Sequence, residues 1–422
     1  MTNDYTGIAK QYEKYRTVQG LMKYINKETM KAQHMKQNKS KAVGIDKVNK
    51  ETYAENLDEN LEQLIKDMKT FSYKPKAVRR TYIPKDNSDK GRPLGILSYE
   101  DKLVQGAFAE VLQEIYEKIF LDCSYGFRPK RDCHQAIKEL DNIIMRKKVN
   151  FIVDADIKSF FDNVNHEWLI KFLEHTIEDM NFIRYIKRFL ISGIMEEGKF
   201  YESDKGTIQG GVISPILANV YLHYVLDLWF EYDVKVRSKG EAYMVRYADD
   251  VVCCFEFEDD AERYFTELKE RLAKFNLELA EDKTRIIPFG RNTEGNKETF
   301  DFLGFTHKDS KGKKGYYKIL HSTSQKKLKV KRAIAKQWIK QNMHTPIEVL
   351  IKRLNTKLIG HYRYYGISDN YKRMRSFTEY VKYELFKHLR RRSQRHKMTY
   401  EKFNRVLEYN PIVYPKIYFS LW

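Results

Sequence analysis

The alternation of apolar and polar positions divides the chain into a long first part with mixed signals and a last part with helix signals alone. Mixed polar helical patterns cover residues 1–40, and further helix-like patterns fit residues 52–69 and 101–120. Between these two, residues 77–96 combine a strand-like VRRTYIP with a polar turn that contains Asn87, Ser88 and Gly91. This segment predicts a β-hairpin.

Downstream the signals alternate until about residue 312. The run NFIVDADI at 150–157 predicts a buried strand, and the Gly-rich turn at 206–211 leads into the apolar helix SPILANVYLHYVLDLWF. GKKG at 312–315 and the lysine run from residue 326 mark a predicted boundary, after which helical patterns continue to about residue 408. An α+β core followed by a helical domain is therefore expected. Further predicted elements are helices at 165–174, 180–193 and 259–275, a strand–turn–strand around YADD at 247–250, and a strand near 284–289.

Composition indicates a folded protein without a membrane span. Charged residues make up 32% and aromatic residues 14% of the 422 positions, and no run of eighteen apolar residues occurs. The N-terminus lacks an apolar signal core, so we expect a cytoplasmic location. The four cysteines show no CxxC spacing, which predicts reduced thiols and neither a disulfide framework nor a structural zinc site. They are Cys123, Cys133, Cys253 and Cys254.

The net charge of +19 is concentrated in the last quarter of the chain. Residues 321–422 hold 24 Lys and Arg against 6 Asp and Glu, a net of +18, which leaves +1 for the preceding 320 residues. Such a module indicates a polyanionic partner, most often nucleic acid, although a solvated lysine-rich helical surface is the alternative. Aromatic residues are interleaved with the basic ones in GHYRYYG at 360–366 and YKRMRSF at 371–377, which favours nucleic acid.

Carboxylates interrupt two apolar strands. Asp249 and Asp250 lie inside MVRYADDVVCCF, and Asp154 and Asp156 lie inside FIVDADIKSFFD. One interpretation is a surface hairpin turn that is capped by the acidic pair. If the two strands are neighbours, however, Asp156 and Asp249 can hold a pair of Mg²⁺ ions, which prefer carboxylate oxygens and would neutralise the charges.

Seven motifs in a fixed order resemble those of bacterial group II intron reverse transcriptases and maturases. The resemblance extends from about residue 20 to the C-terminus. The motifs are RRTYIPKDNSDKGRPLGI (79–96), SYGFRP (124–129), DADIKSFFDNVNH (154–166), GTIQGGVISPILANVYL (206–222), RYADD (246–250), LELAEDKTR (277–285) and FLGF (302–305).

The resemblance implies a right-hand polymerase with interleaved fingers and palm. On this basis we expect an N-terminal extension and fingers at 1–150, a palm with an antiparallel sheet at 151–310 and a helical thumb or maturase domain at 311–422. It also implies an RNA-directed DNA polymerase that adds dNTPs to a DNA or RNA primer on an RNA template, with two Mg²⁺ ions for which Mn²⁺ can substitute. The implied metal ligands are Asp156, Asp249, Asp250 and the carbonyl of Ile157.

Further residues match positions around the incoming nucleotide. Phe161 matches the aromatic residue that excludes a nucleotide 2′-OH, and Phe160 is the neighbour that could hold this place instead. Lys283 is the candidate for protonating or neutralising the leaving pyrophosphate, and a lysine without a role is the alternative. Ile208 replaces a proline that is usual in the family, which puts the fine tuning of the nucleotide pocket in doubt. The remaining implied nucleotide contacts are Lys85, Arg92, Gln209 and Gly210.

The basic last quarter resembles the part of the family that binds intron RNA and assists splicing. Tyr362 and Tyr365, three positions apart, share one helical face, and some tyrosines of this segment are expected in the core. Outside this segment, Arg128 of SYGFRP is a candidate contact with the RNA template. The candidate RNA contacts of the last quarter are Lys357, His361, Tyr362, Arg363, Tyr364, Tyr365, Arg390, Arg391, Arg392 and Arg395.

Two other function classes stay open. One is an RNA-binding splicing factor with an idle polymerase, against which the intact Asp156, Asp249 and Asp250 argue. The other is a domesticated reverse transcriptase that serves phage defence, repair or CRISPR spacer capture. Because no cysteine follows Cys254, we expect no HNH endonuclease domain.

Overall fold

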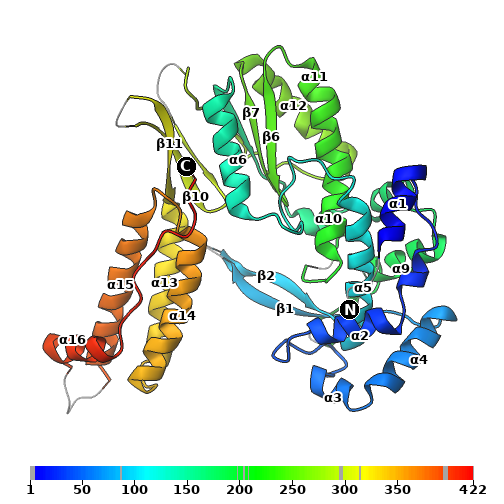
Figure 1. Cartoon of the computed structure of the whole chain (residues 1–422), viewed down its shortest axis with the longest axis horizontal. Coiled ribbons are helices and arrows are strands. Elements are labelled where there is room, and N and C mark those ends of the chain that lie inside the picture. Colours follow the sequence, from blue (N-terminus) through cyan, green and yellow to red (C-terminus); the bar gives the residue numbers. More distant parts are fainter. Residues whose placement is uncertain are drawn as a thin grey trace. The chain divides into compact units, whose positions relative to one another are not determined.

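The computed structural model describes residues 5–85, 88–196, 198–202, 205–207, 209–293, 298–312, 315–392 and 398–421, with the side chains of 84–90 left out. The chain divides into two compact units (Figure 1). The first unit consists of residues 1–136 and 152–286, and the second of residues 137–151 and 287–422.

The N-terminal part of the first unit is helical, as its pattern predicts. Residues 1–40 form three short elements rather than one helix, and α4 buries the apolar stripe of Leu61, Leu64 and Met68. Helix α5 begins where the side chain of Ser98 accepts a hydrogen bond from the backbone N–H of Asp101. The elements are α1 Thr6–Tyr15, η1 Leu21–Tyr24, α2 Lys27–Lys36, α3 Lys50–Ala54, α4 Leu57–Lys69 and α5 Tyr99–Tyr116.

The predicted hairpin is present as β1 (Val78–Lys85) and β2 (Ser88–Ile96). Ser88 and Gly91, which were expected in the turn, belong to β2, and Asn87 lies outside the described residues. The hairpin belongs to a four-stranded sheet in the order β2-β1-β4-β5, where β4 spans Ile194–Glu196 and β5 spans Lys199–Tyr201.

A second sheet, in the order β6-β7-β3-β8, carries the acidic motifs. Residues 251–255 of β7 are all buried, which explains the unbroken apolar run VVCCF. The strands are β3 Phe151–Ala155, β6 Ala242–Tyr247, β7 Asp250–Phe255 and β8 Arg285–Pro288. The associated helices are α7 Phe160–Asn163, α8 His166–Glu174, α9 Met180–Leu190, α10 Ser214–Leu222, the π-helical turns η2 His223–Asp227 and η3 Phe230–Val234, α11 Lys235–Arg237 and α12 Glu258–Lys274.

The second unit combines a three-stranded sheet, in the order β11-β10-β9, with long helices. GKKG, the predicted boundary, lies between β10 and β11 of one hairpin; residues 313 and 314 lie outside the described residues. Helix α6, which the sequence pattern did not predict, spans Cys133–Arg146 and enters this unit at Ile137. The other elements are β9 Thr299–Phe302, β10 Phe305–Lys311, β11 Tyr317–Thr323, α13 Gln325–Asn342, α14 Ile347–Tyr365, α15 Tyr371–Arg390 and α16 Tyr400–Tyr409.

Two absences predicted from composition can be compared with the structure. Within the described ranges, none of the helices combines the length and the apolar character that crossing a bilayer requires. All four cysteines are free thiols, as the absence of CxxC spacing indicated.

Candidate functional site

The YADD motif forms the tight turn between β6 and β7. Tyr247 pairs with Asp250 across the two strands, so Ala248 and Asp249 alone make the connection. Ala248 has a φ of 57°, a conformation that costs a non-glycine residue about 1–2 kcal/mol. A Cβ on Gly126 would clash with the backbone nitrogen of Ala248, so glycine at 126 lets the SYGFRP segment pack directly against the turn.

The buried side chain of Arg246 holds this turn in place. The sequence analysis did not identify Arg246 as a residue of the site. Its side chain is fully buried, and its Nη1 donates to the carbonyl of Ala248 at 3.0 Å. Its Nε donates to Asp227 Oδ1 at 2.7 Å, and its Nη2 donates to Ser124 Oγ at 2.8 Å. Burial lowers the pKa of Arg246, but the charge and hydrogen bonds of Asp227, with smaller contributions from nearby groups, together outweigh this effect and the pKa is raised. The available signal was a charged residue in an otherwise apolar strand, which requires a buried partner.

Arg128 of the SYGFRP segment has a structural environment. Its side chain is 3% exposed, and its Nη1 donates to the carbonyls of Leu121 at 2.7 Å and Ser124 at 3.0 Å. Its Nε and Nη2 both bond the carboxylate of Glu117 at 3.1 Å. These bonds occupy the guanidinium, so the geometry runs against the predicted template contact. Phe127, the preceding residue of the same segment, is not a core residue, since it is 48% exposed.

Asp156 follows β3 directly and is held by the LELAEDKTR segment. The backbone N–H of Ala280 donates to the Asp156 carbonyl at 2.9 Å, and Ile157 forms a β-bridge with Leu279. From the same segment, Lys283 Nζ donates to Asp156 Oδ2 at 2.7 Å. This hydrogen bond raises the pKa of Lys283, so the lysine is a firmly charged cation beside the carboxylate.

Asp156 and Asp249 belong to one electrostatic site, because β3 and β7 are neighbours in the sheet. Burial raises the pKa of Asp249, and the charge of Asp156 raises it further. The cations Arg92 and Arg246 act in the opposite direction without cancelling the shift. Two interacting carboxylates, one of them poorly solvated, form a site that favours a bound cation. Asp250 opens β7 beside them and is exposed.

The two neighbouring phenylalanines have different environments. Phe160 is 2% exposed and packs its ring 6.4 Å from that of Tyr221, whereas Phe161 is only partly buried. Phe160 is therefore a core residue, which leaves Phe161 as the aromatic candidate for contact with a nucleotide.

The loop that contains Gln209 packs against the β1–β2 hairpin. The backbone N–H of Gly95 donates to the Gln209 carbonyl, and Gln209 Nε2 donates to Asp162 Oδ1 at 3.2 Å. Gly210 has a φ of 98°, and a Cβ there would lie 2.8 Å from the Gly95 carbonyl oxygen, so only glycine fits. Arg92 is exposed on β2. The side chain of Lys85 and the whole of Ile208 lie outside the described residues.

In the second unit, three of the predicted RNA contacts have packed side chains. Tyr362 and Tyr365 are 1% and 4% exposed, which confirms that their shared face is core. The His361 ring packs 4.2 Å from the ring of Phe377, and burial lowers the pKa of His361 to about 4. These environments run against direct RNA contact by the three side chains.

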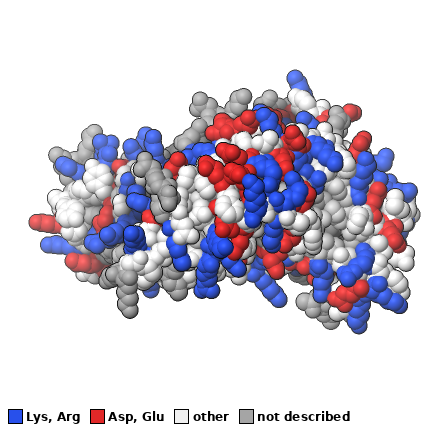
Figure 2. All heavy atoms as spheres, turned by 90° about the horizontal axis from the view of Figure 1, so that it is seen from above, with Lys and Arg blue, Asp and Glu red and all other residues white. Residues whose placement is uncertain are grey.

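The remaining candidates of this unit lie at its surface. Lys357, Arg363, Arg390 and Arg391 are exposed, and Tyr364 is 37% exposed. Arg392 donates to the carbonyl of His344 at 3.1 Å, and Arg395 lies outside the described residues. Figure 2 shows many Lys and Arg side chains over the region of helices α13–α16 (left in the view), with fewer Asp and Glu among them.

Comparison with known families places this geometry in a defined class. The model of the family "Reverse transcriptase (RNA-dependent DNA polymerase)" matches residues 83–307, more than half of the chain. The chain belongs to this family, as its motifs indicated. The model of the "Group II intron, maturase-specific domain" matches residues 327–407, within the basic last quarter. Reverse transcriptases generally use divalent metal ions.

Individual relatives agree with both matches. The chain is 37% identical over 248 residues to the group II intron-encoded protein LtrA of Lactococcus lactis. This match covers 57% of this chain and 39% of LtrA. It is 36% identical over 183 residues to the protein YkfC of Escherichia coli, which covers 43% of this chain and 48% of YkfC. The chain thus matches less than half the length of each of these relatives.

Proposed function

We propose that this protein is an RNA-directed DNA polymerase whose catalytic centre is the Asp156–Asp249 pair. The observation that carries the proposal is the pairing of β3 with β7, which brings Asp156 close enough to Asp249 for their charges to interact. A structural turn residue would gain nothing from being held, poorly solvated, beside a second carboxylate. A polymerase needs this arrangement, because it must concentrate cations at the transferred phosphate.

The residues present fit two Mg²⁺ ions, for which Mn²⁺ can substitute. Asp156, Asp249 and Asp250 offer carboxylate oxygens, and the Ile157 carbonyl is a further candidate ligand. Two such ions would stabilise the attacking and the leaving oxygens of the phosphoryl transfer. Without them, Lys283 Nζ at 2.7 Å from Asp156 Oδ2 supplies part of the neutralising charge.

We propose further roles for residues around the aspartate pair. Arg92 lies near enough to lower the pKa of Asp249, and its guanidinium suits the triphosphate of an incoming dNTP. Phe161 would contact the sugar and exclude a 2′-OH, and Lys283 would protonate or neutralise the pyrophosphate. Gln209 and Gly210 would line the base of the nucleotide pocket, and Lys85 would act as a second phosphate contact.

The second unit carries the proposed RNA-binding surface. We propose that its exposed cations bind group II intron RNA and assist splicing and mobility, because residues 327–407 match a maturase-specific domain and the protein LtrA is intron-encoded. Lys357, Arg363, Arg390, Arg391 and Arg392 are the proposed contacts, with Tyr364 as a stacking surface.

Primer extension tests the polymerase directly. Wild-type protein should add dNTPs to a DNA primer on an RNA template in Mg²⁺, and Asp249→Asn should lower the rate by about 10³-fold or more, because several kcal/mol of transition-state stabilisation are lost. Asp259→Asn is the matched control, since Asp259 is exposed and pairs only with Lys239 among the described residues. Wild-type protein without activity would overturn the proposal and leave an RNA-binding protein with an idle polymerase. An active Asp249→Asn variant would overturn the assignment of the catalytic centre to the Asp156–Asp249 pair.

Sequencing of RNA that co-purifies with the protein from its native cell tests the partner. Enrichment of one structured RNA encoded around the protein's own gene would support the intron-maturase role. Enrichment of an unrelated RNA would favour a domesticated polymerase instead, and the splicing role would then be withdrawn.

A further inference from the structure

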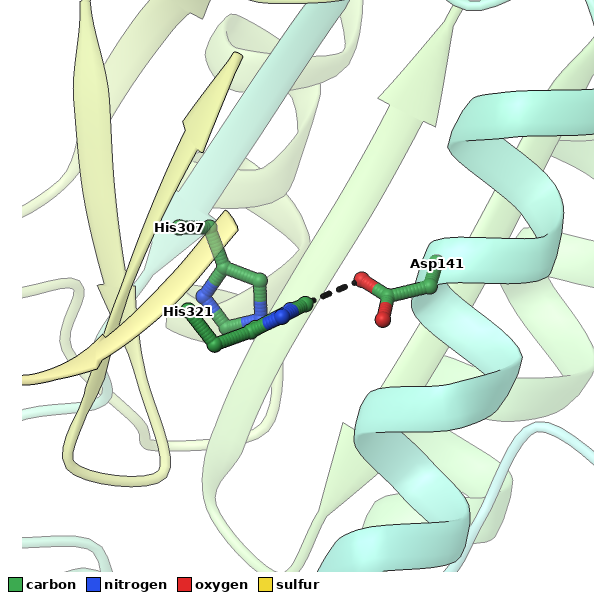
Figure 3. Close-up of side chains that lie close together, drawn as sticks. All are labelled: Asp141, His307 and His321. Atoms are coloured by element: carbon green, nitrogen blue, oxygen red, sulfur yellow. Dashed lines mark hydrogen bonds and ion pairs between the residues drawn. The ribbon is translucent and has the colours of Figure 1, made fainter. Parts of the chain in front are cut away.

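A second cluster of potential metal ligands lies in the second unit. Asp141 on α6, His307 on β10 and His321 on β11 each offer a ligand atom, and these atoms all lie within 4.8 Å of one another. Figure 3 shows both imidazole rings on the hairpin side of the cluster and the Asp141 carboxylate extending toward them from the helix. No residue of this cluster belongs to the polymerase site.

The strand register brings the two histidines together. His307 and His321 are direct partners across β10 and β11, and their ring centroids lie 4.7 Å apart at an interplanar angle of 84°. Phe300, the partner of His307 on β9, stacks on the His307 ring with the ring centroids 4.7 Å apart. The antiparallel pairing therefore fixes both imidazoles on one face of the sheet, and the Phe300 ring limits how His307 can turn.

The cluster is buried, and its polar atoms are poorly satisfied. The three residues are 0–2% exposed, and the single hydrogen bond within the cluster joins His321 Nε2 to Asp141 Oδ1 at 3.0 Å. Among the described residues, four buried atoms of the cluster have no hydrogen-bond partner: Asp141 Oδ2, His307 Nδ1, His307 Nε2 and His321 Nδ1. Each such atom costs about 1–3 kcal/mol, so four in one place demand an explanation.

Alternative explanations account for less of this arrangement. A His321–Asp141 ion pair uses one nitrogen and one oxygen and leaves both nitrogens of His307 without partners. Among the described residues neither ring nitrogen of His307 has a hydrogen-bond partner, so the lone pair of its neutral imidazole is available to a metal ion. The Phe305 backbone lies near the His307 ring but makes no hydrogen bond to either ring nitrogen.

We propose that Asp141, His307 and His321 bind one divalent transition-metal ion, of which Zn²⁺ is the best match. Two neutral imidazoles and a carboxylate form a ligand set that Zn²⁺ accepts in proteins, whereas Mg²⁺ prefers oxygen ligands alone. Ligand atoms around Zn²⁺ lie at about 2.0–2.2 Å from the ion, so the carboxylate and rings must draw together by small side-chain rotations. The bound ion would join α6 to the β10–β11 hairpin and would use electron pairs that otherwise have no partner.

Direct metal binding tests this site. The full-length chain, prepared without a polyhistidine tag and carrying Asp156→Asn and Asp249→Asn to remove the catalytic carboxylates, is stripped with a chelator. It is then titrated with Zn²⁺, and separately with Co²⁺, in excess Mg²⁺. We expect one Zn²⁺ per chain, bound in competition with a chromophoric chelator, visible d–d absorption of bound Co²⁺, and an increase in the thermal midpoint.

Substitutions assign the binding to the cluster. Asp141→Asn, His307→Gln and His321→Gln should each weaken Zn²⁺ binding by roughly 100-fold or more, beyond what the loss of an outer partner costs. His388→Gln is the matched control, because His388 is also buried and lies 3.5 Å from a carboxylate, that of Glu384. Circular dichroism checks that each variant is folded.

The Zn²⁺ titration of the chain with an intact Asp141–His307–His321 cluster tests the proposal even if a variant fails to fold. Absence of one tightly bound Zn²⁺ per chain would overturn the proposal. Stoichiometric binding that persists in folded Asp141→Asn, His307→Gln and His321→Gln chains would overturn it as well.

Discussion

Arg246 and Asp227 form a fully buried bidentate ion pair beneath the turn that carries Asp249. Burial opposes ionisation of Asp227, but the charge and hydrogen bonds of Arg246, together with His223, outweigh it and lower the pKa of this carboxyl. The same guanidinium holds the Ala248 carbonyl, so the pair connects the π-helical turn η2 to the YADD turn. The left-handed Ala248 is thus maintained by a charge network that has no contact with solvent.

Substitution of Arg246 should destabilise the folded protein. Arg246→Met leaves Asp227 buried without its partner and should lower the free energy of unfolding by about 3–5 kcal/mol, measured by urea denaturation. Arg237→Met is the control, because Arg237 pairs at the surface with Asp233 and Glu267 and should cost about 1 kcal/mol or less. Equal losses in the two variants would show that the buried pair is not a special anchor.

Phe160 and Phe161 should separate stability from substrate choice. Phe160→Ala empties a core position and should cost about 3–5 kcal/mol of stability. Phe161→Ala should leave stability nearly unchanged and reduce the preference for dNTPs over ribonucleotides by at least about tenfold, measured as the ratio of kcat/KM values. Unchanged discrimination in Phe161→Ala would remove that residue from the nucleotide pocket.

Lys283 should contribute to the chemical step. Lys283→Ala removes a cation whose pKa the hydrogen bond to Asp156 raises, and it should lower the single-turnover rate by about 100-fold. Lys158→Ala is the control, because Lys158 pairs at the surface with Glu278 of the same segment. If both variants extend primers at the wild-type rate, Lys283 is a structural lysine.

Acid should destabilise the second unit through His361. The pKa of His361 in the folded chain, about 4, lies below the ordinary value near 6.5, so the unfolded chain binds the proton more strongly. The stabilising effect of neutral His361 is therefore complete above about pH 6.5 and is lost as the pH falls toward 4. The stability of wild type relative to His361→Phe should decrease over this window by about 2–3 kcal/mol, measured by urea denaturation at several pH values.

A neighbouring tyrosine provides the control for this pH effect. Burial raises the pKa of Tyr362 to about 12, so Tyr362→Phe should change the stability by the same amount at pH 7 and at pH 4.5. A pH-independent difference between wild type and His361→Phe would contradict the buried, neutral state of His361.

Local signals in the sequence predicted the polymerase motifs but not the long-range partners. The apolar runs around Asp156 and Asp249 predicted two strands, and in the structure β3 ends at Ala155 and β6 at Tyr247, just before these residues. The burial of Arg128 depends on Glu117, and the metal cluster joins Asp141 to His321, 180 positions away. Such residues come together only in the folded chain. A single sequence does not show which distant residues are close in space.

The central proposal is that Asp156 and Asp249 hold the same metal ions. A double-substitution cycle tests this proposal most directly. Single-turnover primer extension on an RNA template is measured for Asp156→Asn, Asp249→Asn and the double variant. If the two carboxylates hold the same ions, each single variant loses about 10³-fold and the double variant lies within about tenfold of the singles. Full activity in either single variant, or losses that multiply in the double variant, would contradict a shared metal site.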